Sequence, residues 1–285
     1  MRTKAWLAAI LLPMLPVIAL AAQSQKEALV QELYVKSGME KQFEQVPLII
    51  QSSFDQEAQK DSGLQNLPEN LTAAIRALVL EAFTPESLKK TMLAELGERL
   101  TVQDLRMVLK WLDSPLGKNC TRLEENATTP EALTEMQQYG AHMTKSPPTA
   151  TRLELIRKLD SAVKATESNI QIGINTHVAV ALAINATFPL EQQKPPDYFV
   201  RQMGKIPPQV EAAVRKETLI SLLFTYRSLT DAEIKKYLEF LRSPAGSKYT
   251  SVSMEAFKKA LFNGSIKWGK AVGEKMQQLK SQSAA

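Results

Sequence analysis

Cysteine and histidine are scarce in this chain of 285 residues, which has one cysteine and two histidines. His142 and His177 lie in different halves of the sequence, and Cys120 is the single thiol, so a zinc site of the Cys/His type is excluded. One cysteine also excludes an intramolecular disulfide. We therefore expect no metal site and a fold that packing alone stabilises.

The sequence motifs of common catalytic and cofactor sites are absent as well: no G-x-S-x-G, Walker A or G-x-G-x-x-G pattern occurs. S-x-x-K patterns occur at 87–90 and 161–164, on expected helices, but the Lys-Ser-Gly at 36–38 precedes both, the reverse of the order in penicillin-recognising enzymes. Adjacent acids such as Glu124 and Glu125 point apart on a helix, so they are expected on a solvated face. We assign no catalytic residue and no cofactor, and we expect that the chain is not an enzyme.

No apolar run is long enough to span a bilayer. The longest lies at 5–20, falls short of the roughly 20 residues needed, and contains two prolines. Arg2 and Lys4 precede it, and an Ala-x-Ala pattern at 19–21 follows, which together are typical of a secretory signal peptide at 1–21. No cysteine lies near the cleavage point, so a lipoprotein is not expected. We predict a periplasmic or secreted protein whose mature chain has no transmembrane helix.

Positive charge is in modest excess, with a formal net charge of +5, of which Arg2 and Lys4 belong to the predicted signal peptide. Six lysines and two glutamates lie in the last 35 residues, so most of the remaining excess is at the C-terminus. Such a small and local excess does not predict nucleic-acid binding.

The feature that the chain does have is an internal repeat. Over the eighteen positions from Leu100 to Gly117, seven residues are identical to those from Leu229 to Gly246, where average residue usage gives about one. The shared signature residues are Thr101, Asp104, Trp111, Ser114, Pro115 and Gly117 in the first copy, and Thr230, Glu233, Phe240, Ser243, Pro244 and Gly246 in the second.

This signature predicts a helical hairpin. The Thr and the acid three residues later form a capping box at the start of one helix, and apolar residues then recur at helical spacing. The Ser-Pro pair ends that helix and begins the next, with Ser as N-cap and Pro at the first helical position. The glycine two residues later leaves room for close approach by Trp111 or Phe240. Cys120 follows on the second helix of the hairpin and aligns with Tyr249 of the other copy. It is expected on an inward face as a buried structural thiol.

Helical periodicity with almost no strand-like alternation covers the rest of the chain, so we predict an all-α fold of two related helical-bundle copies formed by internal duplication. The polar stretch 143–150, which contains Pro147 and Pro148, is the expected linker between copies at 22–142 and 151–285. Helices are expected at residues 25–36, 39–60, 69–82, 85–98, 101–113, 115–139, 150–187, 209–227, 230–242, 244–262 and 265–280.

The aromatic residue, the two positions after it, Ser-Pro-x-Gly and a following lysine resemble the bacterial domain-of-unknown-function 2059 family. The matching segments run from Trp111 to Lys118 and from Phe240 to Lys248. The resemblance implies an exported, all-helical envelope protein of Gram-negative bacteria, here in a tandem version, and it brings no established active site. Leu112 and Leu241 stand where the family commonly has tyrosine, so no tyrosine hydroxyl is expected to act there.

The C-terminal segment combines lysines with apolar residues at helical spacing. Such a helix can lie on an anionic membrane face or bind an acidic partner protein of the envelope. The simpler interpretation, which we favour, is that it packs on the second copy with its lysines in solvent. The lysines that would contact an anionic surface are Lys258, Lys259, Lys267, Lys270 and Lys275.

Three functions are compatible with these features. The leading hypothesis is a noncatalytic adaptor or chaperone-like scaffold with a groove between the copies. The alternative is a carrier of a lipid or other apolar ligand, and a cryptic cell-wall hydrolase ranks third. A continuous apolar cavity of several hundred Å³ would favour the carrier, whereas a filled core with an exposed apolar groove would favour the adaptor.

The hairpin interpretation predicts that Gly246→Leu overpacks the turn and lowers the free energy of unfolding by about 1–3 kcal/mol. Urea unfolding of the variant measures the loss. A variant with the stability of the parent protein would contradict close packing at this glycine.

Overall fold

The computed structural model describes residues 15–59, 65, 69–143, 145–185, 188, 190–203 and 207–283. These residues form helices and connecting turns with no strand, so the predicted all-α fold is confirmed. Residues 1–14 of the predicted signal peptide lie outside the described residues. Within the described ranges, no helix has the length and apolar character needed to cross a membrane.

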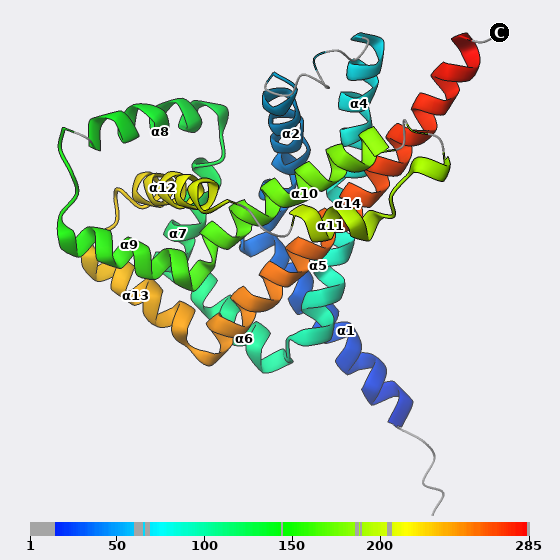
Figure 1. Ribbon diagram of the computed structural model, residues 1–285. Coiled ribbons are helices and arrows are strands. Elements are labelled where there is room, and N and C mark those ends of the chain that lie inside the picture. The colour runs from blue at the N-terminus through cyan, green and yellow to red at the C-terminus, as the bar shows by residue number, and fades with distance from the viewer. Residues whose placement is uncertain are drawn as a thin grey trace, which may run out of the picture.

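Helices form two groups that α10 links (Figure 1). On one side lie α7, α8, α9, α12 and α13, and on the other lie α2, α4, α5 and α14. The elements are α1 (Leu15–Lys36), α2 (Met39–Ala58), α4 (Glu69–Ala82), α5 (Pro85–Arg99), α6 (Val102–Leu112), α7 (Pro115–Asn126), α8 (Pro130–Met143), α9 (Ala150–Val163), α10 (Ala165–Asn185), the 3-10 helix η1 (Leu190–Gln192), α11 (Pro196–Met203), α12 (Pro208–Thr225), α13 (Asp231–Arg242) and α14 (Pro244–Ser283).

Both predicted capping boxes are confirmed. Thr101 Oγ1 accepts a hydrogen bond from the backbone N–H of Asp104 at 3.1 Å, and Asp104 Oδ2 accepts from the backbone N–H of Thr101 at 2.9 Å. Thr230 and Glu233 form the same pair of bonds, at 3.2 and 2.8 Å. Each box therefore satisfies amides that would otherwise be unpaired at the start of α6 and of α13.

The Ser-Pro turns also form as predicted. Ser114 Oγ accepts from the backbone N–H of Gly117 at 3.0 Å, and Ser243 Oγ accepts from that of Gly246 at 3.1 Å. The close approach at the glycines has a different partner from the expected one, however. A Cβ on Gly117 would lie 2.0 Å from the carbonyl oxygen of Trp111, and one on Gly246 would lie 2.1 Å from that of Phe240. The backbone of the preceding helix, rather than its aromatic ring, therefore requires glycine.

The long helix expected at 150–187 is two helices, and this expectation was wrong. Lys164 has φ 56°, in the left-handed region, between α9 and α10. The carboxylate of Asp160 holds the turn by accepting from the backbone N–H and the hydroxyl of Thr166, at 2.8 and 2.7 Å. Gly38, with φ 75°, makes the corresponding turn between α1 and α2. The left-handed conformation costs energy for lysine but not for glycine, so a lysine at this position gives little sign of a turn.

A second expected helix, 115–139, is also divided. It breaks at residues 127–129, and α8 begins at Pro130 after Thr129, whose Oγ1 accepts from the backbone N–H of Ala132 at 3.2 Å. The N-cap threonine and the proline at the first helical position are standard signals for the start of a helix. The signals for this break were therefore present in the sequence, and our prediction missed them.

The two helices expected at 244–262 and 265–280 are instead one, α14, which continues through Gly264 and Gly269. Both glycines receive a neighbouring side chain. A Cβ on Gly264 would lie 2.4 Å from ring carbons of Phe83, and one on Gly269 would lie 2.8 Å from Cβ of Leu182. Tertiary packing therefore compensates for the low helix propensity of these glycines.

The buried apolar residues form two clusters, and each cluster draws on both halves of the sequence. The first combines residues between Val30 and Leu112 with α14 residues between Ala245 and Val272. The second combines Cys120 on α7 with residues between Leu155 and Leu241. Each half thus contributes the helix after its Ser-Pro turn to the core of the other half.

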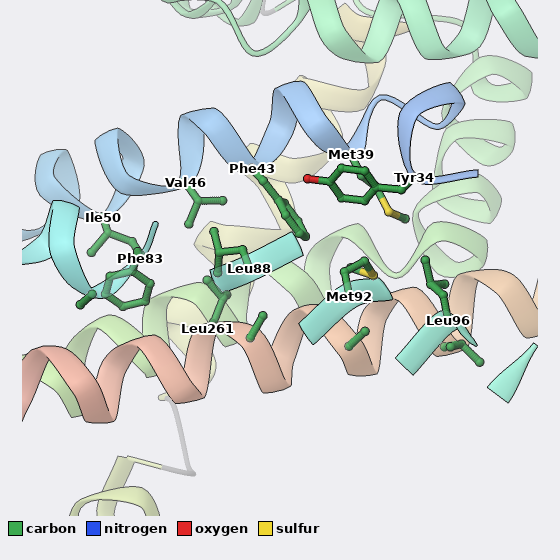
Figure 2. Packing of buried hydrophobic residues seen from close by; sticks show 14 of the residues in the cluster. Tyr34, Met39, Phe43, Val46, Ile50, Phe83, Leu88, Met92, Leu96 and Leu261 are labelled. Carbon is green, nitrogen blue, oxygen red and sulfur yellow. The ribbon is translucent and has the colours of Figure 1, made fainter. Parts of the chain in front are cut away.

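Figure 2 shows the first cluster, where Phe43 of α2, Leu88 of α5 and Leu261 of α14 come together. Trp268 of α14 is fully buried there, and its indole N–H donates to the carbonyl oxygen of Ile75 at 3.0 Å. The expectation that the C-terminal helix packs on the second copy was therefore incomplete. Its apolar face covers the first half, because the two halves exchange helices.

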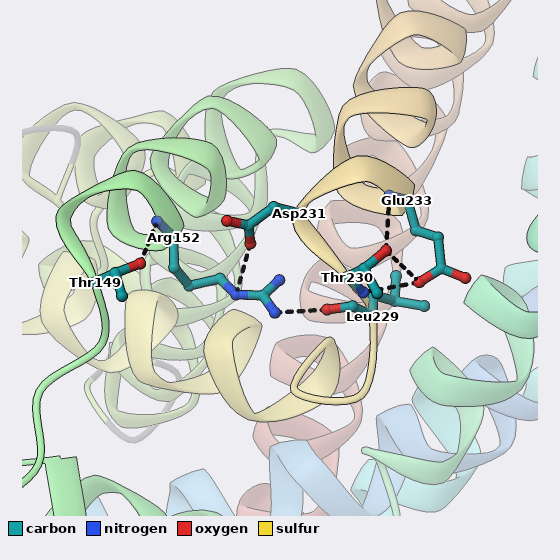
Figure 3. A network of polar contacts seen from close by, with 6 residues as sticks. All are labelled: Thr149, Arg152, Leu229, Thr230, Asp231 and Glu233. Atoms are coloured by element: carbon teal, nitrogen blue, oxygen red, sulfur yellow. Dashed lines mark hydrogen bonds and ion pairs between the residues drawn. The ribbon is translucent and has the colours of Figure 1, made fainter.

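A polar network fixes the start of α13 against α9 (Figure 3). Arg152 Nε lies 3.2 Å from a carboxylate oxygen of Asp231, and its Nη2 donates to the carbonyl oxygen of Leu229 at 2.5 Å. Thr149 caps α9 by accepting from the backbone N–H of Arg152 at 3.2 Å. Together with the box at Thr230, these contacts hold the start of the second hairpin against α9.

Alanine at Gly264 tests the packing of α14. The new Cβ would collide with the buried ring of Phe83, so Gly264→Ala should lower the free energy of unfolding by about 1–3 kcal/mol. Gly97→Ala on α5 is the matched control, because nothing lies within 4 Å of its Cβ position. That variant should be unchanged or more stable by up to about 1 kcal/mol. Equal effects of both substitutions in thermal or urea unfolding would contradict the packing described.

Candidate functional site

A cavity of about 480 Å³ lies between the two halves, and it is the strongest candidate for a functional site. Helices α2, α5, α6 and α7 line it from the first half, and α10, α13 and α14 line it from the second. Gln42, Gln45 and the exposed Ile49 lie at its edge, so its rim is beside α2. Its size is within the range of pockets that hold small-molecule ligands.

Most of the lining is apolar and comes from side chains that are themselves part of the core. These side chains belong to helices that the exchange brings together, so the cavity exists only where the two clusters meet. The buried apolar lining residues include Met39, Phe43, Val46, Ile50, Met92 and Leu261.

Aromatic rings of both signatures form one wall. The rings of Trp111 and Phe240 stack with centroids 4.7 Å apart and planes 6° apart. Trp111 also stacks on Tyr237, at 5.6 Å and 9°. The aromatic positions of the two signatures, which align with one another in sequence, therefore contact each other in space.

The polar end of the cavity is built around Glu124 of α7. Its Oε1 accepts hydrogen bonds from the hydroxyls of Tyr226 and Tyr237, at 2.6 and 2.9 Å. Burial raises the pKa of the Glu124 carboxyl, the two hydroxyls counteract part of this effect, and the nearby carboxylate of Glu125 adds to it. Burial, followed by the charge of Glu124, raises the pKa of both tyrosines well above the ordinary value.

The thiol of Cys120 and the hydroxyl of Tyr249, the third tyrosine of the lining, both have raised pKa values. Cys120 is buried, as predicted, and burial followed by the charge of Glu124 raises its pKa to about 12. Burial raises the pKa of Tyr249, its counterpart in the repeat, to about 12 as well. A thiol that stays protonated at neutral pH is a poor nucleophile, so the arrangement does not favour covalent chemistry at Cys120.

Sequence reasoning missed Glu124, Tyr226 and Tyr237. The two adjacent acids do point apart, and Glu125 forms an ion pair with Lys41 at 2.6 Å. The expected solvated face was wrong for Glu124, which points to the two tyrosines. The signal was available, since Glu124 follows Cys120 by four residues and shares its helix face. An inward Cys120 therefore implies an inward Glu124.

The other signature residues stabilise the fold. Gly117 lines the cavity, while the capping residues and Ser-Pro pairs lie at the turns described above. The lysine that follows the second signature has a further partner: Lys248 Nζ lies 2.6 Å from Asp104, the capping acid of the first copy. Burial raises the pKa of that carboxyl, but bonds from Lys248 and Thr101 outweigh the effect and hold it below the ordinary value.

The structure does not gather the predicted lysines into one site. Lys259 forms an ion pair with Glu95, Lys267 donates to the carbonyl oxygen of Glu81 at 2.7 Å, and Lys270 lies 3.9 Å from Glu274. Since the apolar face of α14 is buried, the helix has little to insert into a lipid surface. Contact of Lys258, Lys259, Lys267, Lys270 and Lys275 with an anionic surface stays a prediction.

Metal chemistry gains no support from the part of the chain that the structure describes. No group of three or more His, Cys, Asp or Glu side chains there could hold a metal ion. His177 is exposed, with Nδ1 2.9 Å from the carbonyl oxygen of Gly173.

Comparison with protein families identifies the segment that carries the first signature. Residues 86–145 match the model of a family described as "Uncharacterized protein conserved in bacteria (DUF2059)". This segment is therefore similar to the domain-of-unknown-function 2059 family. It comprises α6, α7, α8 and nearly all of α5, and so includes Trp111, Cys120 and Glu124. No curated protein and no solved structure matches the chain.

The raised pKa of Glu124 predicts how stability depends on pH. A carboxyl whose folded-state pKa exceeds the unfolded value of about 4.3 stabilises the fold fully below that value, and the contribution is lost as the pH rises through the folded pKa. Relative to Glu124→Gln, the parent protein should therefore lose stability as the pH rises above the unfolded value of about 4.3. Urea midpoints at several pH values measure the difference.

Glu154→Gln is the control of opposite sign. A hydrogen bond from Lys158 lowers the pKa of Glu154, so the parent protein should lose stability relative to this variant as the pH falls. A difference between the parent protein and Glu124→Gln that does not change with pH would contradict the environment described for Glu124.

Proposed function

We propose that this chain is a noncatalytic protein that holds an apolar ligand in the cavity between its two halves. The observation that carries the proposal is the cavity itself, about 480 Å³ in volume and lined mainly by apolar and aromatic side chains. A filled core would have favoured the adaptor hypothesis. A continuous apolar space of this size favours the carrier instead.

The arrangement of polar groups supports binding rather than catalysis. Cys120 and three tyrosines are held in their protonated forms, and Glu124 is engaged by two of the tyrosine hydroxyls. Such groups can orient the polar end of a ligand, as the few polar groups of an apolar pocket commonly do. The proposal therefore assigns no nucleophile and no general base.

Two finer statements belong to the same proposal. The second half is a second unit of the domain-of-unknown-function 2059 family, which is supported by the shared capping boxes, Ser-Pro turns and glycine contacts. The mature chain acts in the periplasm or after secretion, which is supported by the signal-peptide pattern at 1–21.

An adaptor function is the second candidate, and one observation favours it. Leu48 and Ile49 on α2 are 55% and 45% exposed, beside the rim of the cavity. Exposed apolar residues that adjoin one another often belong to interaction surfaces. If affinity capture from envelope extracts retains a protein that Leu48→Asp no longer retains, while ligand binding is unaffected, the adaptor would be favoured.

Binding of a neutral apolar fluorophore, N-phenyl-1-naphthylamine, tests the carrier proposal. Residues 22–285 should bind the probe saturably at one site, with a rise in emission as the probe leaves water. Ser253→Leu places a larger apolar side chain in the lining and should weaken binding about tenfold, since pocket volume is lost.

Ser247→Leu is the matched control, being the same change at an exposed position of the same helix, and it should leave the affinity unchanged. Absence of saturable binding, or equal weakening by both substitutions, would overturn the proposal.

A further inference from the structure

The cavity has a single acidic group among the described residues that line it, the carboxyl of Glu124. No lysine or arginine is among these described residues. An anionic ligand would therefore enter a space that already contains an acid and offers no cation to pair with it.

The groups that bind Glu124 are neutral. Tyr226 and Tyr237 donate from phenol hydroxyls, and both donate to the same oxygen, Oε1. The neighbouring acid Glu125 is already paired with Lys41. The hydrogen bonds that hold Glu124 thus orient its carboxyl group with neutral partners, and a cation bound beside it would favour the ionised form of the carboxyl.

Aromatic rings surround the same region. Trp111, Tyr226, Tyr237, Phe240 and Tyr249 all line the cavity. The face of an aromatic ring carries partial negative charge and attracts a cation, most strongly where water is excluded. The aromatic rings and the acid of the lining therefore favour a cation over an anion.

We propose that the cavity selects amphiphiles whose polar end is a cation, with the ammonium group against Glu124 and the tail among Phe43, Met92 and Leu261. This inference rests on the proposed function, because it requires that the cavity holds an apolar chain. It adds the chemical class of the ligand: an alkylammonium compound, rather than a fatty acid or a neutral alcohol, is the preferred occupant.

The test compares ligands that share one chain and differ in the polar end. Decylamine, decanol and decanoate compete with N-phenyl-1-naphthylamine for residues 22–285 at about pH 8, where alkylamines are protonated and decanoate is ionised. All three are used below the concentrations at which they form micelles. Decylamine should bind at least about tenfold more tightly than decanoate, with decanol between them.

Glu124→Gln should remove this preference. The amide can still accept a hydrogen bond from a tyrosine hydroxyl but carries no charge, so affinity for decylamine should fall about tenfold while that for decanol changes less than about threefold. Glu125→Gln is the matched control, because it removes the adjacent charge outside the lining and should leave the decylamine affinity unchanged.

The outcomes separate the two proposals. Equal affinities for the three ligands, or a preference for decanoate, would overturn the cation inference and leave the carrier proposal standing. Failure of the probe and of every ligand to bind would overturn the carrier proposal itself. The ranking in the parent protein needs no variant, so a Glu124→Gln protein that fails to fold does not prevent the decision.

Discussion

The two Ser-Pro hairpins meet at the stack of Trp111 on Phe240, and the Trp111–Tyr237 stack and the Lys248–Asp104 ion pair lie beside it. The stack brings the ends of α6 and α13 together, so that the helices that follow them, α7 and α14, each emerge beside the opposite half. Both residues pack against both clusters of buried side chains. Their stacking adds only about 0.5–1.5 kcal/mol beyond the area that the rings bury. Its importance lies in its position between the two clusters of buried side chains.

The sequence predicted those parts of the fold that local chemistry decides. Capping boxes, Ser-Pro turns and apolar periodicity act within a few residues, and the hairpins they predicted at Thr101 and Thr230 are present. The errors occurred at two turns that nearby residues form and in one helix that a distant residue keeps intact. Lys164 adopts a left-handed turn, and Gly264 remains helical because Phe83 packs against it. Phe83 could not be named as the partner of Gly264 from one sequence, because the packing of α14 on the first half carries no local signature.

The candidate site was less predictable than the fold for the same reason. Its carboxylate comes from α7 and its phenols come from the turn after α12 and from α13, more than a hundred residues later. Periodicity showed that Cys120 faces inward, and Glu124 shares that face, but which side chains would meet it depends on the exchange of helices. Positions that form a site across an interface of this kind have no fixed spacing in sequence, unlike a metal or nucleotide motif.

The burial of Trp268 against Ile75 also bears on how the chain folds. These residues are separated by 193 positions, and the helix that carries the tryptophan is the last of the described chain. Contacts between such distant residues slow folding, because a long loop must close before the contact contributes any stability. The first core is thus incomplete, with buried residues of α4 and α5 uncovered, until α14 packs against them. Order of synthesis and order of assembly are therefore decoupled in this protein: the half that is made first is completed last.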